Sequence, residues 1–191
     1  VMSLVTGLPV AFKLVTVAGL IGLPLAAYAS FRLLRFNYPG PALASALSVS
    51  FLFNEANSVW GANIASKLAG EFTYSLGTAL LIVFAGTLYR GALSGRGWIG
   101  NGLLLAAIGL CHAYTLLAAA ALGAYLVLFH PAGRRALPYL MKVGAVAFGL
   151  MAFWVIPLLA FTEYTTAYSM VWPIRGFSHV FPVVLWPALG F

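Results

Sequence analysis

Long apolar runs, broken by very few charged side chains, constrain this chain more than any other feature. Only 7% of its 191 residues are Asp, Glu, Lys or Arg, against about 25% in an ordinary soluble domain. Such a chain cannot cover a core with a polar surface, whereas runs of about 20 apolar residues fit the roughly 30 Å hydrocarbon layer of a bilayer. The sequence therefore predicts a multi-pass protein of the cell membrane, in contact with membrane lipid.

The charge balance and the cysteine content exclude other classes. A net charge of +7 would suggest nucleic-acid binding in a soluble protein, but here the basic residues stand in ones and twos at the ends of apolar runs, which is a topology signal. We predict no nucleic-acid partner. The single cysteine, Cys111, cannot form an internal disulfide. Because the chain starts at Val1 and ends at Phe191 inside an apolar run, we expect it to be a fragment of a longer protein.

Apolar runs separated by turns predict an all-α transmembrane helix bundle of about six spans. We expect one partial transmembrane domain over residues 1–191. The predicted spans are 12–34, 42–60, 72–89, 98–111, 114–129 and 139–161, with another beginning in 180–191. The stretch 57–71 is the most polar in the chain, which indicates a loop or an interfacial segment.

Residues 98–129 carry no charged side chain unless His112 is protonated, and as one straight helix they would measure about 48 Å. A hairpin that turns near His112 would place seven basic residues on one side, which the positive-inside rule makes cytoplasmic. An unbroken helix would leave nearly equal numbers of basic residues on the two sides of the membrane, so the hairpin is preferred. Nothing at 111–114, however, is a strong helix breaker. The seven are Arg32, Arg35, Arg90, Arg96, Arg134, Arg135 and Lys142.

The hairpin would also gather the chain's acidic residues and several cations at the outer face. This group consists of Glu55, Lys67, Glu71, His112, Glu163, Arg175 and His179. Ionisable groups near the hydrocarbon are costly unless they are paired or hydrated, so the gathering predicts a site.

Three members of this group have competing interpretations. Glu71 is either a helix-start residue or a group that orients a polar substrate or pairs with Lys67. Glu55 is either a solvated helix-end residue or a ligand contact. His112 is either a satisfied structural histidine or a site residue.

Familiar short motifs are missing from the sequence. A haem or metal site made by this chain alone is not expected, because His130 and His179 lie at span ends. We therefore predict no cofactor and leave open whether a divalent metal takes part. The chain also has no aspartate, which weakens the hypothesis of an ion-coupled carrier.

One long motif and two short ones carry a resemblance to a known family. They are WGANIASKLAGEFTYSL at 60–76, LCH at 110–112 and FWVIPLL at 153–159. Together they resemble the multi-spanning membrane proteins called 6-pyruvoyl-tetrahydropterin-synthase-related, over roughly residues 13–159. That family is similar in turn to the C-type glycosyltransferases, which take a sugar from a polyprenyl-phosphate donor at the outer membrane face. The pterin enzyme in the family name is unrelated, and no pterin chemistry is implied.

The resemblance implies a C-type glycosyltransferase core and a transfer from a lipid-linked sugar to an outer-face acceptor. Glu71 and Tyr74 match the family's acidic-aromatic segment, and His112 matches its histidine at the end of a short span. Lys67 or Arg175 would hold the donor phosphate. Such transferases carry a catalytic aspartate in their first outer loop. Since this chain has none, either that loop precedes the chain or the reaction has been lost.

Two other classes of function stay open at this point. A non-catalytic accessory subunit, packed among other membrane subunits, would have its outer polar cluster filled by a partner's side chains. A transporter would show pseudo-symmetric halves with interrupted spans at matched positions, and the sequence shows no clear internal repeat.

Overall fold

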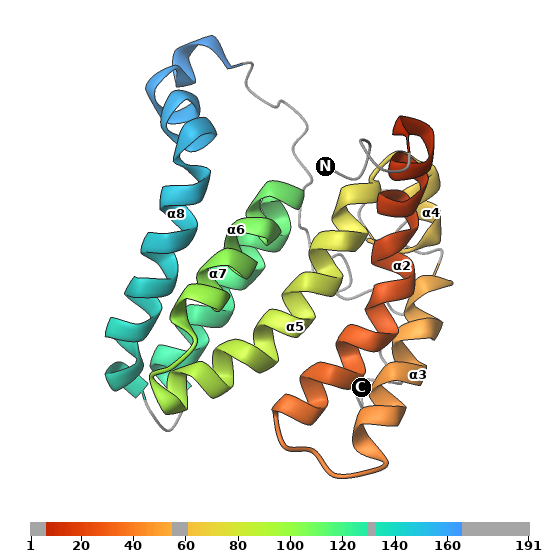
Figure 1. Ribbon diagram of the computed structural model, residues 1–191, viewed down its shortest axis with the longest axis horizontal. Helices are drawn as coiled ribbons and strands as arrows, with labels where there is room; N and C mark the ends of the chain where they lie inside the picture. Colours follow the sequence, from red (N-terminus) through yellow and green to blue (C-terminus); the bar gives the residue numbers. More distant parts are fainter. Residues whose placement is uncertain (1–6, 55–60, 130–132, 166–191) are drawn as a thin grey trace, which may run out of the picture. The chain divides into compact units, whose positions relative to one another are not determined.

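The computed structural model describes residues 7–54, 61–129 and 133–165, and all of its elements are helices (Figure 1). No strand occurs among the described residues, which confirms the predicted all-α class. The chain divides into a unit up to Val155 and a second unit from Ile156. The elements are α2 (Leu8–Leu33), α3 (Gly40–Leu52), α4 (Ile64–Leu68), α5 (Phe72–Ser94), α6 (Trp98–Cys111), α7 (Ala113–Phe129), η1 (Gly133–Ala136), α8 (Leu137–Ala160) and η2 (Thr162–Tyr164).

Three helical stretches are long and apolar enough to cross a membrane: Leu8–Leu33, Phe72–Ser94 and Gly133–Ala160. This confirms the predicted membrane character. The other apolar helices, α3, α6 and α7, have 13, 14 and 17 residues. At 1.5 Å per residue they measure roughly 20 to 26 Å, less than the hydrocarbon thickness. Where 42–60 was predicted to span, α3 ends at Leu52, and 55–60 lie outside the described residues.

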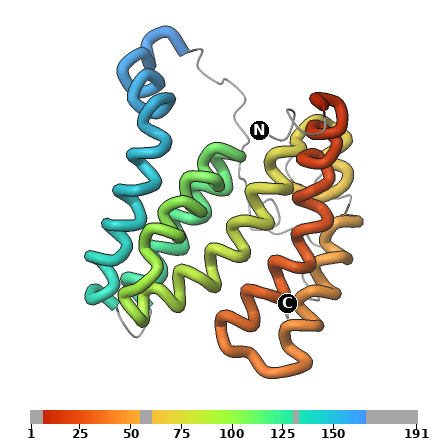
Figure 2. Tube along the Cα trace, viewed as in Figure 1, coloured from red at the N-terminus to blue at the C-terminus, as the bar shows by residue number. Residues whose placement is uncertain are grey.

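The chain reverses direction at His112, as the hairpin interpretation requires. This residue has an extended backbone (φ −163°, ψ 136°) between α6 and α7, and the trace doubles back there (Figure 2). This reversal brings the start of α6 to the start of α8. There the Asn101 side-chain amide donates a hydrogen bond to the Tyr139 hydroxyl.

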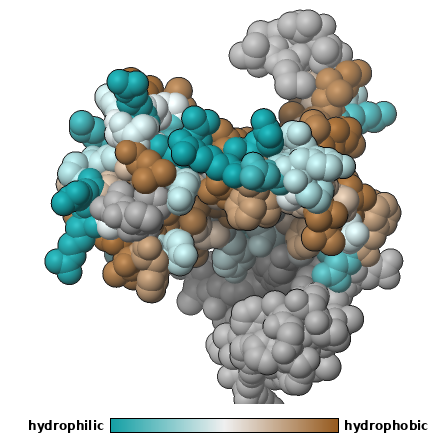
Figure 3. Space-filling model, turned by 90° about the horizontal axis from the view of Figure 1, so that it is seen from below, coloured by the Kyte–Doolittle hydropathy of each residue, from teal (hydrophilic) through white to brown (hydrophobic). Residues whose placement is uncertain are grey.

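The reversal brings the predicted basic cluster to one end of the first unit. The ends of α2 and α5 and the starts of α6 and α8 lie together there (Figure 1), and hydrophilic surface extends across this end (Figure 3). We call it the basic end; it carries the seven residues predicted for the cytoplasmic side. The assignment of this end to the cytoplasm stays a prediction.

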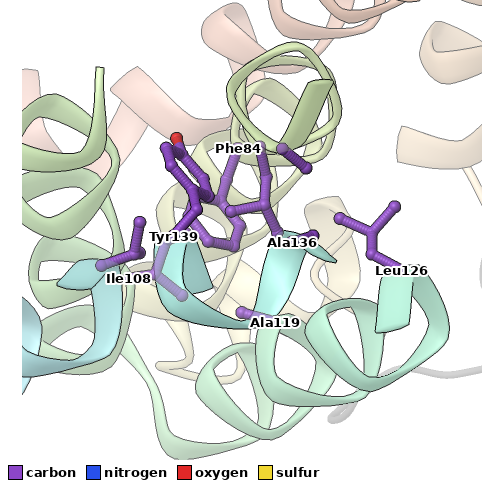
Figure 4. Packing of buried hydrophobic residues seen from close by; sticks show 9 residues of the cluster. Phe84, Ile108, Ala119, Leu126, Ala136 and Tyr139 are labelled. Atoms are coloured by element: carbon purple, nitrogen blue, oxygen red, sulfur yellow. The ribbon is translucent and has the colours of Figure 1, made fainter. Parts of the chain in front are cut away.

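A hydrophobic cluster fixes the α6–α7 hairpin against α5. Its side chains come from α5, α6, α7, η1 and the start of α8, and Phe84 and Ile108 lie at its centre with exposures of 1% and 0%. Ala119, Leu126, Ala136 and Tyr139 pack around them (Figure 4). Close packing of such side chains gives van der Waals contacts, which drive helix association in a membrane. The cluster thereby holds the His112 turn close to the first turns of α5.

Glycines allow α2 to lie close against α5. A Cβ atom added at Gly19 would overlap Ser75 and Leu76, and one at Gly86 would meet Ser30 and Leu33. Small residues at such contacts are typical of helices packed in membranes, where close backbone approach replaces the hydrophobic driving force. This packing holds α5 as a fixed support for the groups at its two ends.

In the second unit, the described residues 156–165 form the last turn of α8 and η2. Pro157 lies inside the end of α8. The Thr165 hydroxyl donates to the Thr162 carbonyl at 2.7 Å, and the rings of Phe161 and Tyr164 lie 6.2 Å apart. The only carboxylate among these ten residues, Glu163, is exposed.

Candidate functional site

The polar connection between α3 and α5 contains a short helix, α4, that positions Glu71. Asn63 caps α4, and its Oδ1 atom accepts a hydrogen bond from the Ser66 N–H group at 2.8 Å. Both of these residues are completely buried. The Ser66 carbonyl in turn accepts from the Glu71 N–H group at 3.1 Å. Gly70, at φ +106°, supplies the left-handed turn between them. The predicted loop at 57–71 is therefore an ordered support over its described residues.

Glu71 is the N-cap residue of α5, as predicted, but its carboxylate makes no capping hydrogen bond within the described chain. Instead Oε2 lies 3.3 Å from Nε2 of His112. The alternative pairing with Lys67 is wrong for the described residues, because α4 ends at Leu68 and the turn at Gly70 takes the two side chains off a common helix face. The Glu71 side chain is 35% exposed, twice the 17% of His112.

Three contacts fix the orientation of His112. Its ring stacks on Tyr74, with ring centroids 4.4 Å apart and an angle of 22° between the planes. Its Nδ1 atom accepts from the Tyr114 backbone N–H group at 3.3 Å, and its carbonyl accepts from the Thr115 hydroxyl at 2.7 Å. Since Nδ1 accepts, the neutral ring carries its proton on Nε2, the atom that lies 3.3 Å from the Glu71 carboxylate. Glu71 and His112 thus form a close polar contact.

Lys67 contributes a cation that forms no ion pair with any described residue. Its Nζ atom is buried and has no hydrogen-bond partner in the part of the chain that the structure describes. Desolvation by burial lowers the pKa of this ammonium below its usual value. The residue precedes the α4–α5 turn, one position after Ser66, whose carbonyl holds the Glu71 backbone. A desolvated ammonium of this kind is stabilised by an incoming anion.

The His112 turn interrupts an apolar stretch of the chain. The 14 residues of α6 measure about 21 Å, short of the roughly 30 Å hydrocarbon thickness. Ionisable side chains next to apolar helices are costly unless they are paired or hydrated, so the paired Glu71 and His112 are candidates for a functional site.

The structure brings together Glu71, His112 and Tyr74 from the set that the sequence predicted. Lys67 lies in α4, four positions before Glu71 in the sequence. Glu55, Arg175 and His179 lie outside the described residues, so their predicted place in the site stays a prediction. Among the described residues, no group of three or more His, Cys, Asp or Glu side chains could hold a metal ion.

Sequence reasoning missed Gly77 and Thr115, which allow the pair to form. A Cβ atom at Gly77 would lie 2.8 Å from the Thr115 hydroxyl oxygen and 3.2 Å from Cβ of Cys111. Only a glycine therefore lets α5 approach the α6–α7 turn this closely. The available signal was a glycine inside an apolar span, one helical turn after Tyr74.

We expect Gly77→Ala to destabilise the protein although alanine favours helix formation. The added methyl group must displace Thr115 and with it the turn that carries His112, a change of the kind that costs about 1 to 3 kcal/mol. Gly123→Ala is the matched control, because Gly123 lies inside α7 with open space around it. Thermal unfolding in detergent should show a lower Tm for Gly77→Ala alone. An equal Tm for both variants would contradict the close contact.

Comparison with known proteins gives one match. Residues 1–191 match the family described as "6-pyruvoyl-tetrahydropterin synthase related domain; membrane protein". No curated protein and no solved structure matches the chain. The match covers every residue of the sequence, including the α4–α5 connection and the His112 turn that build the site. The chain therefore belongs to the 6-pyruvoyl-tetrahydropterin-synthase-related family of membrane proteins.

Proposed function

We propose that this protein transfers a sugar from a polyprenyl-phosphate donor to an acceptor hydroxyl at the outer membrane face. The observation that carries the proposal is the contact between Glu71 and His112, 3.3 Å apart at the break between α6 and α7. The resemblance to C-type glycosyltransferases supplies the substrate class. Glu71, His112, Tyr74 and Lys67 are the residues through which it acts.

Glu71 is the general base of this proposed reaction. One carboxylate oxygen is held by His112, and the side chain is exposed enough to meet an acceptor hydroxyl. The carboxylate takes the hydroxyl proton while the acceptor oxygen forms a bond to the anomeric carbon. The bond between the anomeric carbon and the phosphate oxygen breaks, and its electron pair leaves with polyprenyl phosphate.

Lys67 holds the phosphate in this proposal. The donor is a phosphodiester with one negative charge, whereas the departing polyprenyl phosphate is a monoester with up to two. A desolvated ammonium beside the phosphate therefore stabilises the bound donor as well as the charge that develops on the leaving group. The lack of a described partner for Nζ leaves this cation available for a phosphate oxygen. Arg175 is a second candidate cation, and it lies outside the described residues.

The test uses the full-length protein in vesicles that contain a polyprenyl-phosphate sugar labelled in its sugar. We expect acceptor-dependent loss of label from the lipid fraction, with release of polyprenyl phosphate. Lys67→Gln should raise the donor KM about tenfold, as expected when one charge-assisted hydrogen bond is lost.

The matched control is Lys142→Gln, which removes an exposed cation from α8 at the basic end. Its donor KM should stay at the wild-type value. The proposed function would be overturned if the vesicles released no polyprenyl phosphate with any acceptor. An equal rise of KM in both lysine variants would instead remove Lys67 from the donor site.

A further inference from the structure

A cavity with two arginines in its wall lies at the basic end of the first unit, at the opposite end of α5 from Glu71. It has a volume of about 520 Å³ and lies between the end of α5 and the start of α6, with Leu33 of α2 at its edge. This volume is in the range of small-ligand sites, about 300 to 1,000 Å³. Its polar lining includes Thr87, Arg90, Ser94, Arg96 and Asn101.

The two arginines give this cavity an uncompensated positive charge. Neither Arg90 nor Arg96 forms an ion pair with any described residue. The one described carboxylate of this unit, Glu71, lies at the far end of the 23-residue α5, about 34 Å away along the helix. The first turn of α6 also contains no acidic residue. A concave surface whose charged side chains are all positive concentrates anions.

The floor of the cavity is held in place by buried hydrogen bonds. The Thr87 hydroxyl donates to the Asn101 side-chain oxygen at 2.6 Å, and the Asn101 amide donates to the Thr87 carbonyl at 3.2 Å and to the Tyr139 hydroxyl. Asn101 is only 5% exposed. These bonds tie α5, α6 and α8 together beneath the arginines, so the spacing of the cavity walls does not depend on a ligand.

We propose that this cavity binds the phosphate group of an anionic lipid headgroup. Arginine guanidinium groups match phosphate oxygens in charge and in fork geometry. Leu33 and Leu104 form an apolar part of the wall, which suits the glycerol carbons that follow a lipid phosphate towards the acyl chains. The hydrophilic surface of the basic end, where a headgroup would lie, is visible in Figure 3. This site is independent of the proposed sugar transfer.

Gly100→Leu tests whether the cavity itself is needed. Gly100 lines the cavity, and a Cβ atom there would meet nothing within 4 Å. A leucine there therefore has no clash at Cβ, adds bulk to the cavity wall, keeps both arginines and favours the α6 helix. Gly149→Leu is the control, because Gly149 is an exposed glycine of α8 with open space around it.

The measurement is retention of added lipid by the full-length protein in detergent, followed by native mass spectrometry. Phosphatidylglycerol should be retained at least fivefold more than phosphatidylcholine, whose choline is repelled by the arginines. Gly100→Leu and the pair Arg90→Gln/Arg96→Gln should each lower phosphatidylglycerol retention at least fivefold. Gly149→Leu and the pair Arg134→Gln/Arg135→Gln, which removes the same charge from η1, should retain it.

Two results would overturn the proposal. Equal losses of phosphatidylglycerol retention from both arginine pairs would show diffuse attraction to the basic end. Unchanged retention in Gly100→Leu would show that the cavity is not used.

A competition experiment with inorganic phosphate separates the two possible sources of the anion. Displacement of phosphatidylglycerol by millimolar phosphate supports recognition of the lipid phosphate, whereas phosphate binding without any lipid retention would assign the cavity to a soluble phosphate ester and overturn the lipid source.

Discussion

Glu71→Gln is expected to lower the rate of sugar transfer at least about a hundredfold, since proton transfer by a positioned base contributes about 10² to 10⁴. The amide keeps the size of the side chain and can still accept a hydrogen bond from His112, but it cannot take the acceptor proton. The loss should therefore fall on kcat with little change in the donor KM. The rate of this step is measured as the single-turnover release of polyprenyl phosphate from labelled donor.

A second variant at the same position sharpens this expectation. Glu71→Asp keeps the charge but shortens the side chain by one methylene, which breaks the contact with His112 and should give an intermediate rate. If Glu71→Gln transferred sugar at the wild-type rate, the carboxylate would not be the base of the reaction.

The fold was largely predictable because membrane solvation leaves few choices. A chain with so few charges must satisfy its backbone hydrogen bonds internally, and helices do this within one segment. The reversal at His112 was predictable only through the distribution of arginines, since neither 111–114 nor the flanking residues hold a helix breaker. The early end of α3 at Leu52 was not predictable, because apolar composition continues into Phe53 and the turn depends on contacts from the α4 segment.

The candidate site was predictable as a set of residues but not as a set of pairs. Spacing suggested Glu71 with Lys67, since residues four apart share one face of a continuous helix. The left-handed Gly70 ends that continuity, and the partner of Glu71 comes from 41 positions later in the sequence. That pairing depends on the small size of Gly77, which lets the α6–α7 turn approach α5. A single sequence marks such a glycine but does not say what it approaches.

His112→Phe tests whether this pair acts as one unit. Phenylalanine keeps an aromatic ring that can stack on Tyr74, as His112 does at 4.4 Å, but it lacks the Nε2–H group that holds Glu71 at 3.3 Å. If this contact tightens to a hydrogen bond to the charged carboxylate during the reaction, it contributes about 1.5 to 3 kcal/mol, so we expect kcat to fall roughly 10- to 100-fold. The donor KM should not change, and the Tm should stay near that of the wild type. His112→Ala, which also removes the stacking, should lower the Tm as well.

The double variant Glu71→Gln/His112→Phe decides the role of the histidine. If His112 acts only by holding the carboxylate, removing it matters little once the carboxylate is gone, and the double variant should be no slower than Glu71→Gln alone. If the two reductions in kcat multiplied instead, His112 would act on the substrate independently of Glu71. The 3.3 Å contact would then not serve to position the base.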